Sequence, residues 1–91
     1  PAIPTEFAVS SIYPNPFNPT TTIDISIPHN MHLSLKVIDI QGRVVETITE
    51  KDYIAGNYSI RYDGSSLSSG IYFVQLKSPT QVQYSKMILL K

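Results

Sequence analysis

The chain has 91 residues, no cysteine, and seven basic and seven acidic residues that give a formal net charge of zero. A chain of this length forms one domain and buries only about 60–65% of the surface that its unfolded form exposes, which leaves little room for an enclosed active site. The missing cysteines exclude disulfides, thiolate chemistry and cysteine-based zinc sites. The basic residues are scattered, which argues against nucleic-acid binding because that needs a stripe of positive charge.

Neither a membrane span nor an initiator methionine is present. The longest apolar run, residues 87–90, is far shorter than the about 20 residues that a helix needs to cross a bilayer, so we expect no membrane insertion. The chain begins with proline. We therefore expect a piece of a longer protein, in which residues 1–7 are a linker from an upstream cargo and residues 8–91 form the domain.

Apolar and polar residues alternate with a period of two, which is typical of strands with one buried face. Ile23, Ile25 and Ile27, for example, alternate with Asp24 and Ser26. The pattern predicts seven strands, over residues 7–12, 21–27, 32–38, 43–48, 57–62, 71–77 and 82–90. Short strands at this spacing predict an all-β fold, an immunoglobulin-like seven-stranded antiparallel β-sandwich.

Prolines and glycines mark the connections between these strands. Residues 14–19 contain three prolines and are expected to form a stiff connector that crosses between two sheets. Residues 39–42 are expected to form a tight hairpin in which Gly42 has a positive φ. Residues 63–70 are expected to form a polar loop that Leu67 anchors to the core.

The last strand has an unusual pattern. Val82 and Tyr84 are in one phase, Met87 is in the other, and Ile88 with Leu90 makes both faces apolar. A bulge near residues 85–86 would explain the shift of phase. An apolar outer face would serve as a docking surface. The alternative is a central strand that is covered on both faces.

Few residues suggest chemistry. His29 and His32 could share a metal ion, but a zinc site needs three or four ligands, so we expect solvated turn histidines. Four carboxylates could meet as a calcium site or a hydrolytic pair: Asp39, Glu50, Asp52 and Asp63. We prefer a role in capping turns through the backbone for Asp39 and Asp63. We therefore predict no catalytic residue, no cofactor and no metal, and hence no enzyme.

The six tyrosines raise the possibility of sugar binding. Three of them are in phase with aliphatic residues and are assigned to the core: Tyr58, Tyr62 and Tyr72. Three other aromatic residues lie in or beside loops and stay open as sugar contacts: Tyr13, Phe17 and Tyr53. An accessory carbohydrate-binding module therefore remains an alternative function, as does an immunoglobulin-like spacer of a secreted enzyme.

Several sequence blocks, taken together and in order, resemble one known family. They are residues 13–23 (YPNPFNPTTTI), 39–45 (DIQGRVV), 55–58 (AGNY), 63–64 (DG), 67–72 (LSSGIY) and 86–91 (KMILLK). The chain resembles the type A C-terminal sorting domain of the type IX secretion system of Bacteroidota-like Gram-negative bacteria, over about residues 8–91. Two positions depart from the family pattern, because Tyr62 is often tryptophan there and the turn at residues 79–81 contains no glycine.

The resemblance implies a non-catalytic secretion signal with an immunoglobulin-like fold. Such a domain directs an upstream cargo through the periplasm to the outer-membrane translocon. A cell-surface sortase then removes it, and the cargo is released or joined to the surface. The implied partners are the translocon, the sortase and the cargo. The domain itself is expected to be a monomer on a secreted or cell-surface protein.

The predicted recognition surface combines the last strand with the nearby hairpin. Its residues are Arg43, Lys86, Met87, Leu89 and Lys91. We expect recognition by a folded surface and no chemical step.

Overall fold

The computed structural model describes residues 4–91, and within this range the chain forms seven strands and no helix. They are β1 (Ala8–Tyr13), β2 (Thr20–Ile27), β3 (Met31–Asp39), β4 (Val44–Tyr53), β5 (Gly56–Asp63), β6 (Gly70–Lys77) and β7 (Val82–Leu89). All seven predicted strands are present. Only β4 is clearly longer than predicted, because its last residues are charged and lie on an exposed edge, where alternation is not required.

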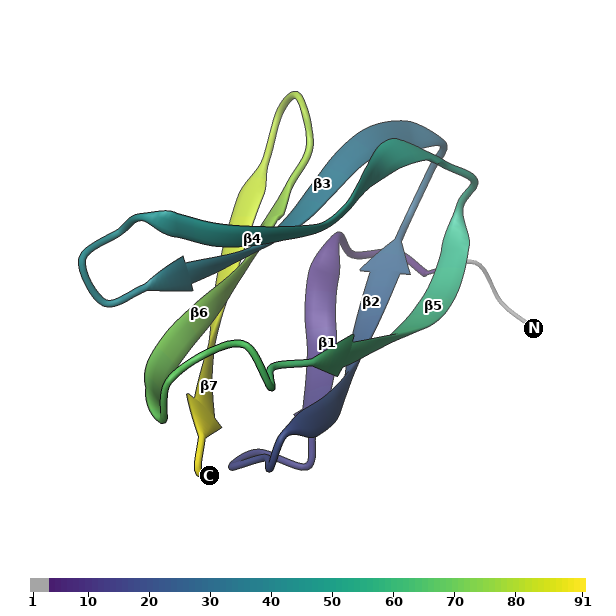
Figure 1. Ribbon diagram of the computed structural model, residues 1–91. Helices are drawn as coiled ribbons and strands as arrows, with labels where there is room; N and C mark the ends of the chain where they lie inside the picture. The colour runs from purple at the N-terminus through teal and green to yellow at the C-terminus, as the bar shows by residue number, and fades with distance from the viewer. Residues whose placement is uncertain (1–3) are drawn as a thin grey trace.

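The strands form two antiparallel sheets that face each other (Figure 1). One sheet has three strands in the order β1-β2-β5, and the other has four in the order β4-β3-β6-β7. This arrangement confirms the predicted all-β, immunoglobulin-like sandwich.

The core lies between the sheets and is built from the alternating apolar residues. The side chains with no exposed surface come from facing strands: Ile23, Ile25 and Ile27 of β2, Leu33, Leu35 and Val37 of β3, Val74 and Leu76 of β6, and Met87 and Leu89 of β7. Tyr62 and Tyr72 are buried as predicted, and Tyr58 packs partly buried against the same cluster. Leu67 also packs there, which confirms its role as the anchor of its loop.

Residues 14–19 do not cross between sheets, so that expectation was wrong. They join β1 to β2, which pair with each other in the three-stranded sheet. Phe17 is nevertheless buried in the core and forms a parallel bridge with Leu89 of the other sheet. The segment therefore returns to its own sheet after tethering the two layers, and it lies beside the C-terminal end of β7 (Figure 1).

The last strand contains no bulge, so the prediction of one near residues 85–86 was also wrong. Its pairing with β6 is unbroken from Lys77 opposite Val82 to Gly70 opposite Leu89. The phase changes because the inward positions near the open end of the sandwich hold Gln83 and Ser85. Polar side chains are tolerated there because those positions are not fully buried.

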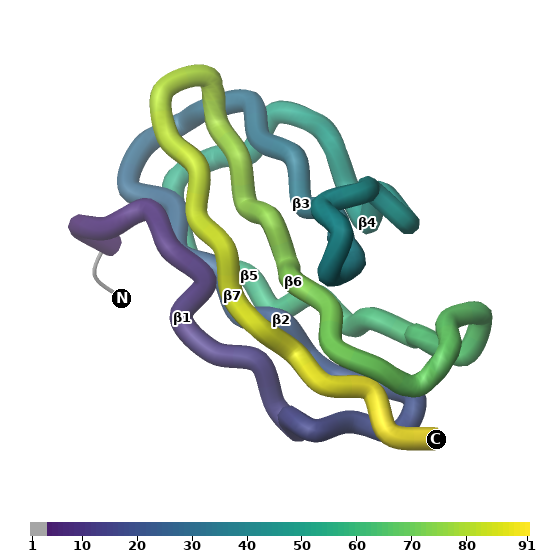
Figure 2. Tube along the Cα trace, turned by 90° about the vertical axis from the view of Figure 1, so that its left-hand side faces the viewer, coloured from purple at the N-terminus to yellow at the C-terminus, as the bar shows by residue number. Residues whose placement is uncertain are grey.

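Strand β7 is an edge strand, which contradicts the alternative of a central strand covered on both faces. It lies beside β1, the edge strand of the other sheet (Figure 2). On its outer face Val82 and Tyr84 are 46% and 56% exposed, respectively. The apolar outer face predicted from the sequence is therefore present.

Two turns are closed by short polar side chains. In the β3–β4 hairpin Gly42 has a φ of 85°, as predicted. The Asp39 carboxylate there accepts hydrogen bonds from the backbone N–H groups of Gln41 and Arg43, at 2.9 and 3.0 Å. These bonds, the one from Arg43 N–H first, lower the pKa of Asp39.

The β6–β7 turn needs no glycine because Ser78 closes it. Its hydroxyl accepts hydrogen bonds from the backbone N–H groups of Thr80 and Gln81, and its own N–H donates to the Gln81 carbonyl at 2.8 Å. Serine favours turns of this kind by bonding to the backbone two or three residues further on. The departure from the family pattern at residues 79–81 is therefore structurally harmless.

Candidate functional site

The predicted recognition residues lie at one end of the four-stranded sheet. Ile38 of β3 pairs with both Val44 of β4 and Phe73 of β6, and Phe73 pairs with Lys86 of β7. Arg43, next to Val44, is thus level with Lys86 but on the opposite edge. Three strand spacings of about 4.8 Å separate the two edges by roughly 14 Å. Arg43 and Lys86 therefore share an end of the sheet without forming one cluster.

Met87 and Leu89 do not lie on the surface. Both are 0% exposed and belong to the central apolar cluster. A partner cannot contact them while the domain stays folded. The exposed side chains of the last block are instead Lys86, Leu90 and Lys91.

The outer edge of β7 is covered by two residues of the connector. The Asn15 side chain donates from Nδ2 to the Lys86 carbonyl at 3.0 Å and accepts at Oδ1 from the Ile88 N–H at 2.9 Å. The Phe17 N–H donates to the Ile88 carbonyl, and the Leu90 N–H donates to the Phe17 carbonyl, at 2.9 and 3.0 Å. Asn15 and Phe17, which we call the β7 clamp, thus take the place of a neighbouring strand.

The Phe17 ring explains why the clamp stays closed. It packs edge-on against Tyr62 with a centroid distance of 6.5 Å. A Cβ on Gly64 would lie 3.2 Å from the Phe17 ring and 3.5 Å from a methyl group of Leu89. Glycine at position 64 therefore lets both side chains reach the core.

Tyr62 stands where the family often has tryptophan, and its hydroxyl is satisfied. It donates to Glu46 Oε1 at 2.7 Å. Burial is the main reason why the pKa of Tyr62 is raised, with the neighbouring Glu46 as the second cause. The substitution keeps an aromatic ring against Phe17 and gives its polar end a partner, so this departure also fits the fold.

Lys91 is held against the loop that precedes β6. Its Nζ donates to the Ser65 carbonyl at 2.7 Å, and its backbone N–H donates to the Ser69 hydroxyl at 2.9 Å. The Asp63 carboxylate caps the same loop by accepting from the Ser65 hydroxyl and N–H, and these bonds lower the pKa of Asp63. Capping is thus the observed role of Asp63, as it is of Asp39.

His32 lies in a second region, at the far end of β3 and β4. Its Nδ1 is 2.8 Å from Asp52 Oδ1 and its Nε2 is 3.7 Å from Glu50 Oε2. The hydrogen bond with Asp52 is the main cause that raises the pKa of His32. These contacts pair His32 with carboxylates of β4. Across residues 4–91, no group of three or more histidine, aspartate or glutamate side chains is arranged to hold a metal ion.

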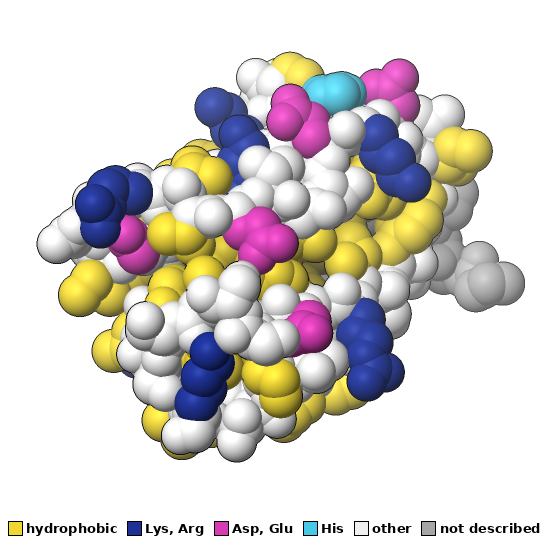
Figure 3. All heavy atoms as spheres, in the orientation of Figure 1, with side chains coloured by type: hydrophobic (Ala, Val, Ile, Leu, Met, Phe, Trp, Pro, Cys, Tyr) yellow, Lys and Arg dark blue, Asp and Glu magenta, His cyan; other side chains and the backbone are white. Residues whose placement is uncertain are grey.

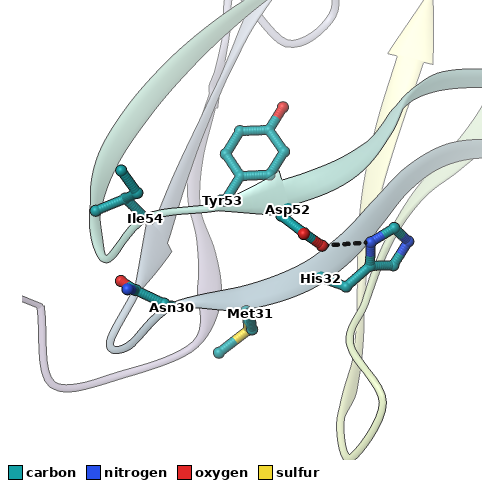
Figure 4. A pocket seen from close by; sticks show the side chains of 6 residues that line it. All are labelled: Asn30, Met31, His32, Asp52, Tyr53 and Ile54. Atoms are coloured by element: carbon teal, nitrogen blue, oxygen red, sulfur yellow. Dashed lines mark hydrogen bonds and ion pairs between the residues drawn. The ribbon is translucent and has the colours of Figure 1, made fainter.

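A hollow of about 420 Å³ lies next to His32. Figure 4 shows that its side chains do not converge on one point, since Tyr53 and Met31 extend to opposite sides while His32 turns toward Asp52. His32 and Asp52 form a hydrogen-bonded pair there, but no serine, threonine, cysteine or lysine nucleophile is among the residues that line the hollow.

The aromatic residues do not form one sugar-binding platform. Phe17 is buried, and Tyr53 packs edge-on against Tyr58 at 5.0 Å. Tyr13 and Tyr84 are exposed by 53% and 56%, but they lie on different sheets. The charged side chains visible in Figure 3 are dispersed and mixed in sign. No helix able to span a membrane occurs among residues 4–91.

Comparison with known families decides among these alternatives. The sequence model of the secretion system C-terminal sorting domain matches residues 11–91, which include the β7 clamp and all of β7. The chain belongs to this family. The match confirms the resemblance to the type IX sorting domains. No curated protein matches the chain.

Membership gives the sorting domain its general role. It is a C-terminal sorting signal for type IX secretion, associated with that system and with a cargo, and its protein is secreted or displayed at the cell surface. Domains of this family are in general non-catalytic.

Sequence reasoning missed the residues that hold β7 in place, Asn15, Gly64 and Ser69. A signal for Asn15 was available in principle, because an asparagine between two prolines lies in extended chain, where its amide can bond to a strand edge. Its partner could not be found from the sequence, since the two hydrogen bonds join residues 71 and 73 positions apart.

Proposed function

We propose that residues 8–91 are read by the type IX translocon as a folded signal, through the exposed charges of Lys86 and Lys91 with Arg43 at the opposite edge. Residues 1–7 connect the domain to its upstream cargo, and residues 1–3 lie outside the described range. The cargo reaches the translocon from the periplasm of a Gram-negative bacterium. A surface sortase then removes the sorting domain, which acts as a monomer.

The division of β7 into buried and exposed residues supports this proposal best. Met87 and Leu89 are fully buried, and burying each side chain contributes roughly 2–3 kcal/mol. The backbone that carries Lys86 and Lys91 is therefore fixed before any partner arrives. A recognition surface that is already ordered loses less conformational entropy when it binds. Met87 and Leu89 thus act as anchors, and the lysines make the contact.

The experiment is an export assay in a host with type IX secretion. Residues 1–91 are fused behind a fluorescent reporter that carries a Sec signal, and the reporter is measured in the periplasm and in the medium. Lys86→Glu with Lys91→Glu should leave the reporter in the periplasm. The matched control, Lys51→Glu with Arg61→Glu, reverses two exposed charges elsewhere and should be exported normally.

Folding must be separated from recognition, because Lys91 also donates to the Ser65 carbonyl. Lys91→Gln keeps a donor while removing the charge. Thermal melts of all variants should stay close to wild type, since isolated exposed charges contribute about 0–1 kcal/mol. Normal export of the Lys86→Glu, Lys91→Glu reporter would refute recognition through these lysines.

Cleavage is tested with the same reporter. The exported reporter should be smaller than the periplasmic form by about the mass of the domain. An exported reporter that keeps residues 8–91 would contradict removal by a sortase while leaving the export signal intact.

A further inference from the structure

The outer face of β6 and β7 is largely apolar, although it points away from the core. Five of its eight outward side chains, which we call the β6–β7 face, are apolar: Ile71, Phe73, Val82, Tyr84 and Ile88. The other three, Gln75, Lys77 and Lys86, lie among them. Ile71, Val82 and Tyr84 are 43%, 46% and 56% exposed, respectively. The corresponding face of the three-stranded sheet is polar: Thr22, Asp24, Ser26, Asn57 and Ser59 occupy its centre. Exposed apolar side chains that gather on one face mark an interaction site more often than apolar residues scattered singly do.

The charged side chains at the outward positions of β6 and β7 are both lysines. Lys77 and Lys86 occupy outward positions of β6 and β7, and Lys36 pairs with the neighbouring Gln75 from β3. None of the outward positions of β6 and β7, all of them within the described residues, holds a carboxylate. The outward carboxylates Glu50 and Asp52 of the same sheet lie on β4 against His32, and Glu50 also lines a hollow with Lys36 and Lys77.

This charge pattern indicates which kind of partner can bind the β6–β7 face. Two copies of the domain that met through this face would bring lysine against lysine, and like charges in an interface cost several kcal/mol. A partner with carboxylates around an apolar centre would instead pair with all three lysines.

Tyr84 is suited to be the central contact of such an interface. Its hydroxyl accepts a hydrogen bond from Gln75 Nε2 at 3.0 Å, which fixes the ring across the sheet. Tyrosine is one of the residue types that contribute most to binding when they are buried at the centre of an interface.

The size of the face indicates weak binding. Two strands at about 4.8 Å and eight residues at about 3.3 Å give roughly 250 Å² per partner, below the about 600 Å² per partner at which standard specific interfaces begin. Such contacts are transient, and the lysines make them sensitive to salt. Transient binding suits a signal that must be released after export.

We propose that the β6–β7 face docks onto a carboxylate-rich protein surface of the type IX secretion machinery. This inference rests on the proposed function and adds a second contact to it, which shares Lys86 with the contact at the end of β7.

The first experiment uses the export reporter described above. Val82→Thr with Tyr84→Thr removes the apolar centre while keeping β-forming residues, and the export rate should fall about tenfold, as is typical when a central aromatic contact is removed. The control is Tyr13→Thr, because Tyr13 is exposed to nearly the same extent but lies on the other sheet. Unchanged export of the Val82→Thr, Tyr84→Thr reporter would overturn the proposal.

A second, charge-reversal variant covers the case in which the threonine variant fails to fold. Lys36→Glu with Lys77→Glu leaves the apolar centre intact and should lower the export rate by a similar factor. Arg61→Glu, on the polar sheet, is its control. Equal export of Lys36→Glu, Lys77→Glu and Arg61→Glu would also overturn the proposal.

Photocross-linking identifies the occupant. The probe is p-benzoylphenylalanine at position 84 or, as the control, at position 13, in the exporting host. The proposal expects a protein adduct only from position 84, linked to a segment that contains aspartate or glutamate, and lost in the Lys36→Glu, Lys77→Glu background. An adduct with a second copy of the domain, an adduct with lipid, or equal adducts from both positions would contradict it.

The two proposals fail in different ways. If the unaltered fusion is not exported, or if Lys86→Glu with Lys91→Glu has no effect, the proposed function fails. If the unaltered fusion is exported, Lys86→Glu with Lys91→Glu blocks export, and the β6–β7 face variants are exported normally, only the docking inference fails.

Discussion

The two edges of the four-stranded sheet are protected in different ways. Strand β4 is distorted by two register shifts and carries Glu46, Glu50, Lys51 and Asp52 near or on its surface. Strand β7 is regular and largely apolar, and the β7 clamp covers its C-terminal half. Both solutions prevent pairing with another chain, one by distortion and charge and the other by covering the edge. Of the two solutions, only the β7 clamp joins a sheet edge to the core. Changes at β7 should therefore lower the free energy of unfolding more than changes at β4.

The largest expected effect is from Phe17→Ala. It removes a buried ring from the clamp and should lower the free energy of unfolding by about 3–5 kcal/mol, enough to unfold much of a small domain. Ile48→Ala on β4 removes a partly buried side chain and should cost only about 1–2 kcal/mol. Urea denaturation of both variants measures the difference. Similar losses would mean that β7 is not tied more tightly to the core than β4.

The next effect concerns the asparagine that stands in for a strand. Asn15→Ala leaves two backbone groups of β7 without their partner and should cost about 1–3 kcal/mol. The matched change at the β4 side is Asn30→Ala, which removes a single bond to the Ala55 N–H and should cost about 0.5–1.5 kcal/mol. Hydrogen exchange at the Ile88 amide should accelerate in the first variant. An unchanged Ile88 amide would contradict the covering role of Asn15.

A smaller effect is expected at the β4 hairpin. Gly42→Val places a β-branched residue at a φ of 85° and should cost more than about 1 kcal/mol. Gly42→Asn should be milder, because asparagine tolerates the left-handed region. Equal stability of the two variants in denaturant melts would show that steric strain at this turn is negligible.

The smallest effect is the dependence on pH at the far end of β4. The pKa of His32 is raised in the folded state, mainly by its hydrogen bond with Asp52. The pair of His32 and Asp52 therefore stabilises the fold fully below about pH 6, and this stabilisation is lost as the pH rises through the folded-state pKa. The melting temperature of the wild type should therefore decline between pH 6 and 8 by more than that of His32→Gln. If the melting temperatures of the two proteins change with pH in the same way, the His32 pair does not stabilise β4.

The sequence was sufficient for the strands because their alternation is local. Strand β2, for example, follows directly from three isoleucines at every second position. The bulge predicted in β7 was wrong because a change of phase in an apolar pattern has two causes, an extra residue or a polar residue at an inward position near the end of a sheet. Only the pairing with β6 distinguishes them.

The sequence predicts only in part which residues of the candidate site are exposed. The exposure of Lys86 and Lys91 follows from their charge, whereas Met87 and Leu89 were grouped with them although an alternating strand places neighbours on opposite faces. The clamp could not be predicted, since Asn15 and Lys86 are 71 residues apart and nothing local indicates the pair.

The separation in sequence between the β7 clamp and the strand that it covers also affects when the domain can fold. A ribosome that adds about 5–20 residues per second needs roughly 4–14 s to make the 71 residues from Asn15 to Lys86. During that time Phe17 has no Leu89 beside it, and the edge it will cover does not exist. The sandwich therefore closes only after residues 86–90 have been made, so a chain interrupted before them would present open strands and an unpacked aromatic ring to chaperones and proteases.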